Sequence, residues 1–457
     1  MVAAGRAGGT PEVIAEVAAA SLLVAAMVFG GGSRGAGDVV VQLFAIPALC
    51  LAVLRWRHAD ATRLQRLFLW WAIAAAAFVL LQLIPVPAAW FASLPQRAAV
   101  LGDLHRAGLQ PDHLPLTLDR WGTVRTGLAF ASFAAMALLA STLSARARQR
   151  LWTVALLAAV PMALLGFSQA AAGAASPLRF YDYHHPIGAI GLFANRNHFA
   201  DLLGLLLPFA LVFALQAQER LQRGLAVGWY ALGIVLLLAS ALSFSRAGFA
   251  VTILGLLASI VLLLLRRRES GGGRMRHLLP VLALATAVLG IATYAWDGIA
   301  ARLAQDPLDD LRWQYVHYGL DALRAWLPMG SGFGTFRFVY APFEPIGAMT
   351  YVYALHAHND LLELLIEGGV IASALLLCLL AFVAMQFEAF RHRADASADV
   401  RSPAVKMHIA ATIACVVPLL HSLVDYPLRT LAIAVPFGLA LATGLSTPRV
   451  RPLRAGS

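Results

Sequence analysis

The chain has 457 residues, of which 60% are hydrophobic and 13% are charged, and its mean hydropathy is +0.73. Soluble domains contain about 45–50% apolar and about 25% charged residues, so this composition excludes a cytosolic enzyme, a disordered chain and a fibrous protein. The net charge of +11 lies in short arginine clusters without interleaved aromatic residues, a pattern that argues against nucleic-acid binding. The three cysteines each lie in an apolar run and are too few for a disulfide framework or a four-thiolate zinc site.

Apolar runs long enough to cross a bilayer recur along the chain. A transmembrane helix needs about 20 apolar residues. In chain order, the runs are 13–30, 38–54, 67–85, 123–144, 151–170, 198–216, 225–243, 247–265, 278–295, 366–387, 408–422 and 429–446. Glu12 and Glu16 at the start of the first run favour a span over a signal peptide. We therefore predict an all-α polytopic membrane protein of about 12 transmembrane helices, in which residues 1–446 form a single integral-membrane domain.

The arginines predict the orientation of these spans. Most lie in short segments between alternate runs, for example in residues 55–66, 146–150 and 266–276. Because short cytoplasmic loops are enriched in lysine and arginine, both termini are expected in the cytoplasm, including a tail at 447–457. Two long segments, 86–121 and 296–365, then lie on the outer face. The second has apolar residues at helical spacing over 311–326, which indicates an amphipathic helix.

Polar residues gather where the spans meet this outer face, and polar residues at membrane depth are functional candidates. They form four clusters, at 193–200, at 243–248, at Arg312 with the glycine-rich residues 330–334, and at 356–363. The candidate site residues in these clusters are Asn195, Arg196, Asn197, Arg246, Arg312, His356, His358, Asn359 and Asp360.

Arginine next to histidine suggests a phosphate group held beside a general base. The planar guanidinium fork suits phosphate oxygens, and Asp360 and Glu363 lie close enough in sequence to fix the tautomer of His358. The alternatives are structural: Arg196 and Arg246 as residues that cap helix ends, and His358 as a core histidine. A zinc site built from His356, His358 and Asp360, with His184 and His185, is a further alternative. However, arginines already neutralise a diphosphate, so we expect no metal and no cofactor.

In this order, the motifs resemble the O-antigen ligase-like family of bacterial polysaccharide polymerases and ligases. The matching residues are 195–200 (Asn-Arg-Asn-His-Phe-Ala), 245–246 (Ser-Arg), 330–336, 358–363 and 421–428 (His-Ser-Leu-Val-Asp-Tyr-Pro-Leu). They are spread over residues 195–428, about half of the chain, and the first 190 residues match only as generic spans. The first and last motifs are closer to the exopolysaccharide polymerases than to the lipopolysaccharide ligases.

The resemblance implies a metal-independent glycosyltransferase with a GT-C-like fold in the bacterial inner membrane. The donor would be an oligosaccharide linked to undecaprenyl diphosphate, used at the periplasmic face. The acceptor would be a second lipid-linked repeat or lipid A–core. It also implies that 296–365 is the periplasmic catalytic segment, that His358 is the base, that Arg246 and Arg196 hold the diphosphate, and that Arg312 is a third candidate. His356 makes the choice of base ambiguous.

Two other classes of function compete with this interpretation. A transporter or flippase would also have about twelve spans, but such proteins often contain inverted repeats and charges near the midplane. We find no repeat in the sequence, and the charged clusters lie at one face. A scaffold of a secretion complex would leave Arg196, Arg246 and His358 freely replaceable.

Overall fold

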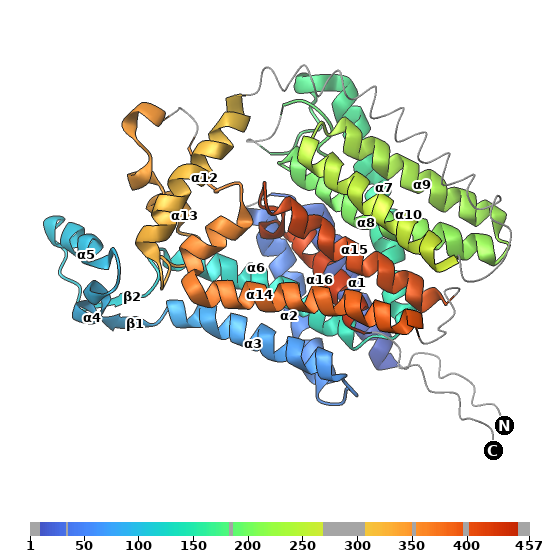
Figure 1. The fold of residues 1–457 in the computed structure, drawn as a ribbon, viewed down its shortest axis with the longest axis horizontal. Coiled ribbons are helices and arrows are strands. Elements are labelled where there is room, and N and C mark those ends of the chain that lie inside the picture. Colours follow the sequence, from blue (N-terminus) through green and yellow to red (C-terminus); the bar gives the residue numbers. More distant parts are fainter. Residues whose placement is uncertain are drawn as a thin grey trace.

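The structure, a computed structural model, describes residues 10–32, 35–181, 186–267, 307–349, 353–395 and 402–446. It consists almost entirely of helices (Figure 1). The long apolar ones are α1 (Thr10–Phe29), α2 (Ala36–Trp56), α3 (Arg63–Gln82), α6 (Arg120–Ser141), α7 (Ala145–Ala172), α8 (Arg196–Glu219), α9 (Arg223–Leu242), α10 (Arg246–Arg267), α14 (Asp360–Asp395), α15 (Pro403–His421) and α16 (Leu431–Leu445).

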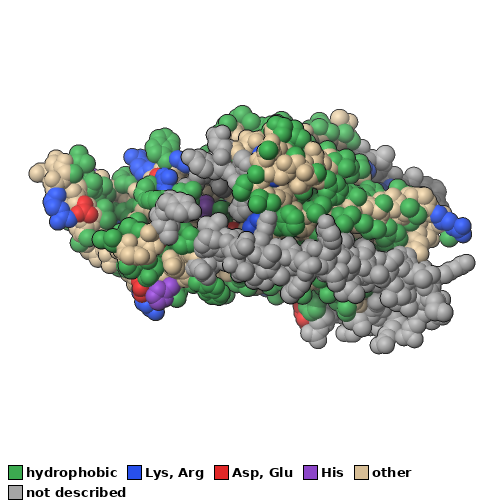
Figure 2. Space-filling model, turned by 90° about the horizontal axis from the view of Figure 1, so that it is seen from above, with side chains coloured by type: hydrophobic (Ala, Val, Ile, Leu, Met, Phe, Trp, Pro, Cys, Tyr) green, Lys and Arg blue, Asp and Glu red, His purple; other side chains and the backbone are tan. Residues whose placement is uncertain are grey.

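These helices confirm a multi-pass, all-helical membrane protein. Among the described residues, nine helices are long and apolar enough to cross a membrane, and two shorter apolar helices, Arg246–Leu262 and α16, accompany them. Every predicted span coincides with one of the long helices, except 278–295, which lies outside the described residues. Hydrophobic side chains cover most of the described surface in Figure 2, as expected for helices that contact lipid. The total of 12 spans and the GT-C likeness remain predictions.

The helices form two groups that meet at α15 and α16 and where α1 packs on α7 (Figure 1). Helices α7, α8, α9 and α10 pack together, whereas α1, α2, α3, α6 and α14 form the other group. Helix α8 is buried along nearly its whole length, from Asn197 to Ala217. A helix that is apolar on all sides belongs in a core. The polar residues at its outer end, Asn197, His198 and Asp201, are therefore buried as well.

The two ends of the described chain lie at the same end of the bundle. Gln65 at the start of α3 donates a hydrogen bond to the Ser446 hydroxyl (2.9 Å), and Arg148 donates to the Ser446 carbonyl (3.2 Å). At the same end, Arg55 donates to the carbonyl of Pro11 (3.2 Å). This is the arginine-rich end that the sequence predicts to face the cytoplasm; the direction itself remains a prediction.

Both long segments that are predicted to lie on the outer face contain short elements. The first holds strand β1 (Pro85–Pro87), α4 (Ala88–Ser93), α5 (Arg97–Arg106) and β2 (His113–Pro115), with Val86 opposite Leu114 in an antiparallel pair. The second holds α12 (Pro307–Trp326), the amphipathic helix expected at 311–326, followed by α13 (Phe336–Val339). The buried Arg97 guanidinium joins the segments by donating to the carbonyls of Leu116 (2.7 Å) and Gly330 (2.8 Å).

Helix α14 is interrupted at Gly369, where φ is +57°. A side chain at this position would collide with the carbonyl oxygen of Pro328. The loop that follows α12 satisfies carbonyls near the break: Ser331 N donates to Ile366 O (3.0 Å) and Gly332 N to Glu367 O (2.9 Å). The interruption thus divides α14 into a short polar part at the outer face and a long apolar part.

Candidate functional site

A buried carboxylate, Asp425, lies where the polar clusters of the outer face meet. It follows α15 and precedes the short helix η5 (Pro427–Arg429), and its side chain is fully buried. Side chains from α8, α12 and the start of α14 surround it: Asn197 (Nδ2 to Oδ2, 2.5 Å), His358 (Nδ1 to Oδ1, 3.3 Å), Arg312 (Nη2 to Oδ2, 3.6 Å) and His198 (Nε2 to Oδ1, 3.7 Å).

Polar neighbours and the Arg312 charge keep the Asp425 carboxylate charged. Burial alone would raise the pKa of Asp425, but the neighbouring His198, His358 and Arg312 outweigh burial and hold this pKa well below its ordinary value. A buried charge is tolerated only when it is paired and hydrogen-bonded. Asp425 therefore fixes the positions of groups that come from three distant parts of the chain.

His358 is the more accessible of the two histidines in the 356–363 cluster. Its side chain is 26% exposed, and its backbone has φ of +49°, a left-handed conformation that turns the chain immediately before α14. Asn359 caps that helix by accepting a hydrogen bond from Leu362 N (3.0 Å). A carboxylate beside Nδ1 favours the tautomer that carries its proton there, which leaves Nε2 as the basic nitrogen.

His356, in contrast, is buried in a structural arrangement. Its Nδ1 lies 2.9 Å from Oε1 of Glu363, whose Oε2 accepts a hydrogen bond from Ala357 N (2.8 Å). The His356 ring also stacks on Tyr426 at a centroid distance of 4.1 Å. The predicted pairing of Asp360 and Glu363 with His358 is wrong: Glu363 contacts His356, and the carboxylate beside His358 is Asp425.

A second charged cluster lies behind the first, around Arg429. The guanidinium contacts three carboxylates: Asp360 (Nε to Oδ1, 2.9 Å), Glu363 (Nη1 to Oε1, 3.0 Å) and Glu367 (Nη1 to Oε2, 3.1 Å). Burial opposes its charge, but these carboxylates raise the pKa of Arg429 above its ordinary value. Arg429 thus holds the polar part of α14 against the segment that carries Asp425.

Replacing Arg429 with methionine is expected to lower stability strongly. Removing one partner of a buried ionic cluster costs about 3–5 kcal/mol because the remaining charges lose their compensation. Thermal unfolding of the purified protein in detergent measures the effect. The matched control is Arg324→Met, which breaks an exposed pair with Asp321 (2.6 Å) whose two side chains are 75% and 47% exposed; an exposed pair contributes about 0–1 kcal/mol. Equal melting temperatures for the two variants would contradict this account of Arg429.

Arg196 and Arg246 begin two helices that pack against each other. Arg196 is the first residue of α8 and Arg246 the first of α10, and both side chains are half-buried. Gly248 lies so close to Ala200 that a Cβ there would come within 2.7 Å of the Ala200 Cβ. Since Asn197 bonds to Asp425, the two arginines lie at the same end of the bundle as the Asp425 cluster. Asn195 caps α8 by accepting from Asn197 N (2.9 Å).

Several polar residues of this region are not among the candidate site residues predicted from the sequence. Asp425, His421 and His198 lie within the family motifs without a predicted role, and Arg429 and Asp201 lie just outside them. In the structure, His421 Nδ1 lies 3.0 Å from Asp201 Oδ1 in a fully buried pair. The signal that could have identified Asp425 is its place inside an apolar stretch, where a charge is costly. His184 and His185, the other residues considered for zinc, lie outside the described residues.

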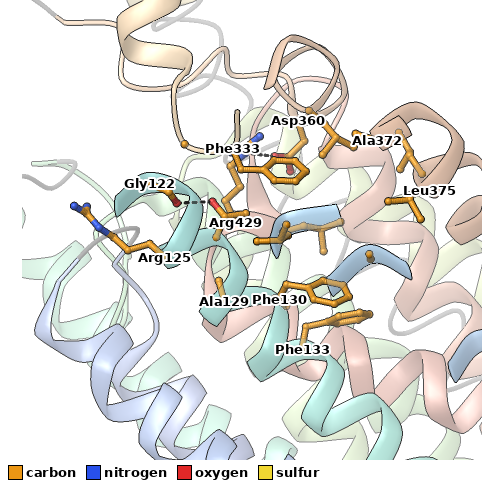
Figure 3. Close-up of a pocket in the computed structure, with 18 of the residues that line it drawn as sticks. Gly122, Arg125, Ala129, Phe130, Phe133, Phe333, Asp360, Ala372, Leu375 and Arg429 are labelled. Atoms are coloured by element: carbon orange, nitrogen blue, oxygen red, sulfur yellow. Dashed lines mark hydrogen bonds and ion pairs between the residues drawn. The ribbon is translucent and has the colours of Figure 1, made fainter. Parts of the chain in front are cut away.

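A cavity of about 380 Å³ lies next to this site, between α2, α3, α6 and α14. Its inner walls are apolar, and Figure 3 shows Ala129, Phe130 and Phe133 along one helix. Its outer end reaches His356, Asp360 and Arg429, so the cavity borders both charged clusters.

Comparison with known protein families identifies one domain. Residues 231–377, about a third of the chain, match the family model of the O-antigen ligase domain, which confirms the resemblance seen in the sequence over these residues. No curated protein sequence matches the chain significantly. An O-antigen ligase domain implies a glycosyltransferase-type enzyme that acts on lipid-linked glycans in a membrane. Of the candidate residues, Arg246, Arg312, His356, His358, Asn359 and Asp360 lie inside the matched range, and Asn195, Arg196 and Asn197 precede it.

Proposed function

We propose that this protein transfers a glycan from undecaprenyl diphosphate to a hydroxyl group of an acceptor glycan, at the periplasmic face of the bacterial inner membrane. The observation that carries the proposal is the position of the partly exposed His358 beside the buried Asp425 (3.3 Å), with Arg312 at the same carboxylate (3.6 Å). A base oriented by a carboxylate and accompanied by a cation suits a hydroxyl attack that expels an anionic leaving group.

In the proposed reaction, the acceptor hydroxyl attacks the anomeric carbon of the donor sugar. The new carbon–oxygen bond forms as the bond to the diphosphate breaks, and the diphosphate leaves with the bonding electrons. Nε2 of His358 takes the hydroxyl proton. Asp425 stabilises the imidazolium that results, because its negative charge lies next to Nδ1.

Arg196, Arg246 and Arg312 are proposed to bind the diphosphate. Negative charge increases on the leaving group in the transition state, and preorganised cations in a site with little water stabilise that charge effectively. The proposed substrate-binding site also includes Asn195, Asn197, Asn359, Asp360 and His356. The segment 296–365 is proposed as the catalytic segment because it supplies Arg312 and His358.

The arginine assignment predicts large losses of activity. Arg196→Ala and Arg246→Ala are each expected to reduce turnover by at least about 10²–10³-fold, as the loss of a charge-stabilising donor does in other enzymes. Arg246→Lys should restore little activity, since an ammonium group cannot reproduce the bidentate fork. The control is Arg223→Ala, which also removes the first residue of a helix but lies on the exposed start of α9. Full activity of Arg246→Ala would contradict its proposed role.

One experiment tests the function itself. The purified protein is incubated with a defined undecaprenyl-diphosphate oligosaccharide, with and without lipid A–core. Chain lengthening without lipid A–core identifies a polymerase, whereas transfer only to lipid A–core identifies a ligase. Addition of EDTA should leave either rate unchanged, because the proposed mechanism uses arginines in place of a metal. Absence of both products would overturn the proposal.

A further inference from the structure

The cavity between α2, α3, α6 and α14 is a long apolar groove to which the proposed reaction assigns no role. Aromatic side chains make up much of its wall: Trp71, Phe78, Phe130, Phe133, Phe333 and Phe437. Along α6, its lining runs from Gly122 to Phe133. At 1.5 Å per residue this is about 16 Å, roughly half of the hydrocarbon thickness of a bilayer. The groove is therefore suited to an extended apolar chain that runs alongside membrane-spanning helices.

The outer end of the groove carries two arginines, Arg125 and Arg337, that can donate hydrogen bonds to a ligand. Arg337 on α13 lies 3.8 Å from the Asp119 carboxylate, and its buried Nε has no hydrogen-bond partner among the residues that the structure describes. Asp119 is engaged as the cap of α6, because it accepts a hydrogen bond from Gly122 N (2.9 Å). Arg125, one turn further along α6, is exposed and also lines the groove. Although Asp38 and Asp119 also line the groove, its two arginines supply charged hydrogen-bond donors, which favours an anionic head group.

The opposite wall of the groove reaches the catalytic region. His356, Asp360, Ser422 and Arg429 line it there, and Ser422 donates a hydrogen bond to the Asp360 carboxylate (3.1 Å). In Figure 3, Arg125 points away from Asp360 and Arg429. A phosphate bound by Arg125 and Arg337 would therefore lie apart from His358, across the groove.

We propose that this groove holds the lipid of the acceptor, so that the acceptor is a glycan linked through phosphate to a single long polyprenyl chain. Arg125 and Arg337 would bind that phosphate. The donor does not fit this position, because its diphosphate must adjoin the bond that breaks next to His358. An acceptor does fit, since its glycan separates its phosphate from its attacking hydroxyl. A cavity of about 380 Å³ is small for several acyl chains, which favours a single polyprenyl chain over lipid A. The inference rests on the proposed function.

The first test measures binding without turnover. A photoreactive amino acid is placed at position 376, where Leu376 lines the groove, or at position 377, where Leu377 is 66% exposed and does not line it. The protein is reconstituted in phosphatidylethanolamine nanodiscs with undecaprenyl diphosphate as the probe. We expect the probe to be captured at 376 at least about 10-fold more than at 377, as direct contact in a pocket requires. Capture of phosphatidylethanolamine alone at 376 would overturn the inference, because the groove would then be a crevice filled by bilayer lipid.

The second test separates the acceptor from the donor. In the donor substrate, the hydroxyl that could attack another donor is methylated, so this molecule cannot act as an acceptor. In the acceptor substrate, a C-glycosidic link joins the glycan to the lipid, so this molecule cannot act as a donor. Leu376→Trp and Arg337→Gln should raise the KM for the acceptor by about 10-fold or more, with the donor KM little changed. Leu377→Trp is the matched control and should behave as the wild type.

The outcomes distinguish this inference from the proposed function. If the groove variants raise the KM for the donor instead, the groove belongs to the donor, and the acceptor assignment is wrong while glycan transfer stands. If the wild-type protein transfers glycan and neither groove variant changes the KM for the acceptor, only the proposed acceptor site is contradicted. If the wild-type protein transfers no glycan, the proposed function and the acceptor role fail together.

Discussion

His358→Ala is expected to reduce turnover of a lipid-linked donor by about 10²–10⁴-fold, the usual contribution of a general base. The attacking hydroxyl has a pKa far above neutrality and needs a positioned base. His358 combines partial exposure with a carboxylate 3.3 Å from Nδ1, so its Nε2 is available to the substrate. His356→Ala should lose much less activity, because that ring is buried against Glu363 and Tyr426.

The measurement is the initial rate at neutral pH for both variants, side by side with His317→Ala. His317 is an exposed histidine on α12 and serves as the control for loss of an imidazole. If His356→Ala is inactive and His358→Ala works, the wrong histidine has been assigned. If both retain near-normal rates, the protein has no histidine base in this segment.

Asp425→Asn is expected to have an effect of similar size, about 10²-fold or more on kcat. The amide keeps the shape of the side chain but removes the charge that stabilises an imidazolium at His358. An amide can also present its NH₂ group to Nδ1, which favours the tautomer that carries its proton on Nε2. In that tautomer, Nε2 cannot take the proton of the attacking hydroxyl. Because Asp425 acts through His358 and is fully buried, the KM for the donor should change far less than kcat.

Asp321→Asn, a carboxylate-to-amide change on the exposed pair with Arg324, is the matched control. Thermal unfolding is recorded in parallel, since Asp425 also holds Asn197, His198 and Arg312. A variant that melts like the wild type and keeps its kcat would show that Asp425 does not orient the base. If KM rises while kcat is unchanged, Asp425 acts in substrate binding instead.

Most of the fold could be predicted from the sequence because span length and arginine placement are local signals. The runs at 13–30 and 225–243, for example, became α1 and α9 with ends shifted by at most a few residues. The amphipathic helix predicted at 311–326 is present as part of α12, since apolar residues on one face of a helix recur with the helical period. The antiparallel pair of β1 and β2 is not predicted, because strands of three residues each leave little periodicity to detect.

The candidate site was predicted in its parts but not in its pairings. His358, Arg312 and Asn197 were all selected, and the structure brings them to one carboxylate. That carboxylate, Asp425, was not selected, because it is 67 residues from His358 and 228 from Asn197 along the chain. Sequence proximity favoured Asp360 and Glu363 as partners of His358. The pairing depends on how α8, α12 and α14 pack, and no local signal encodes that.

The interruption of α14 at Gly369 has a consequence for how this helix tolerates sequence change. Before the break, three carboxylates contact Arg429: Asp360, Glu363 and Glu367. A substitution at any of them removes a partner from this buried ionic cluster, so few replacements are expected to be tolerated there. After the break, residues such as Leu377 face outward, where any apolar side chain of similar size serves. Gly369 itself has no room for a Cβ. An engineer who redesigns the part of α14 after the break can therefore treat it as a separate helix, provided that Gly369, the nine residues before it and the side chains that line the groove are left as they are.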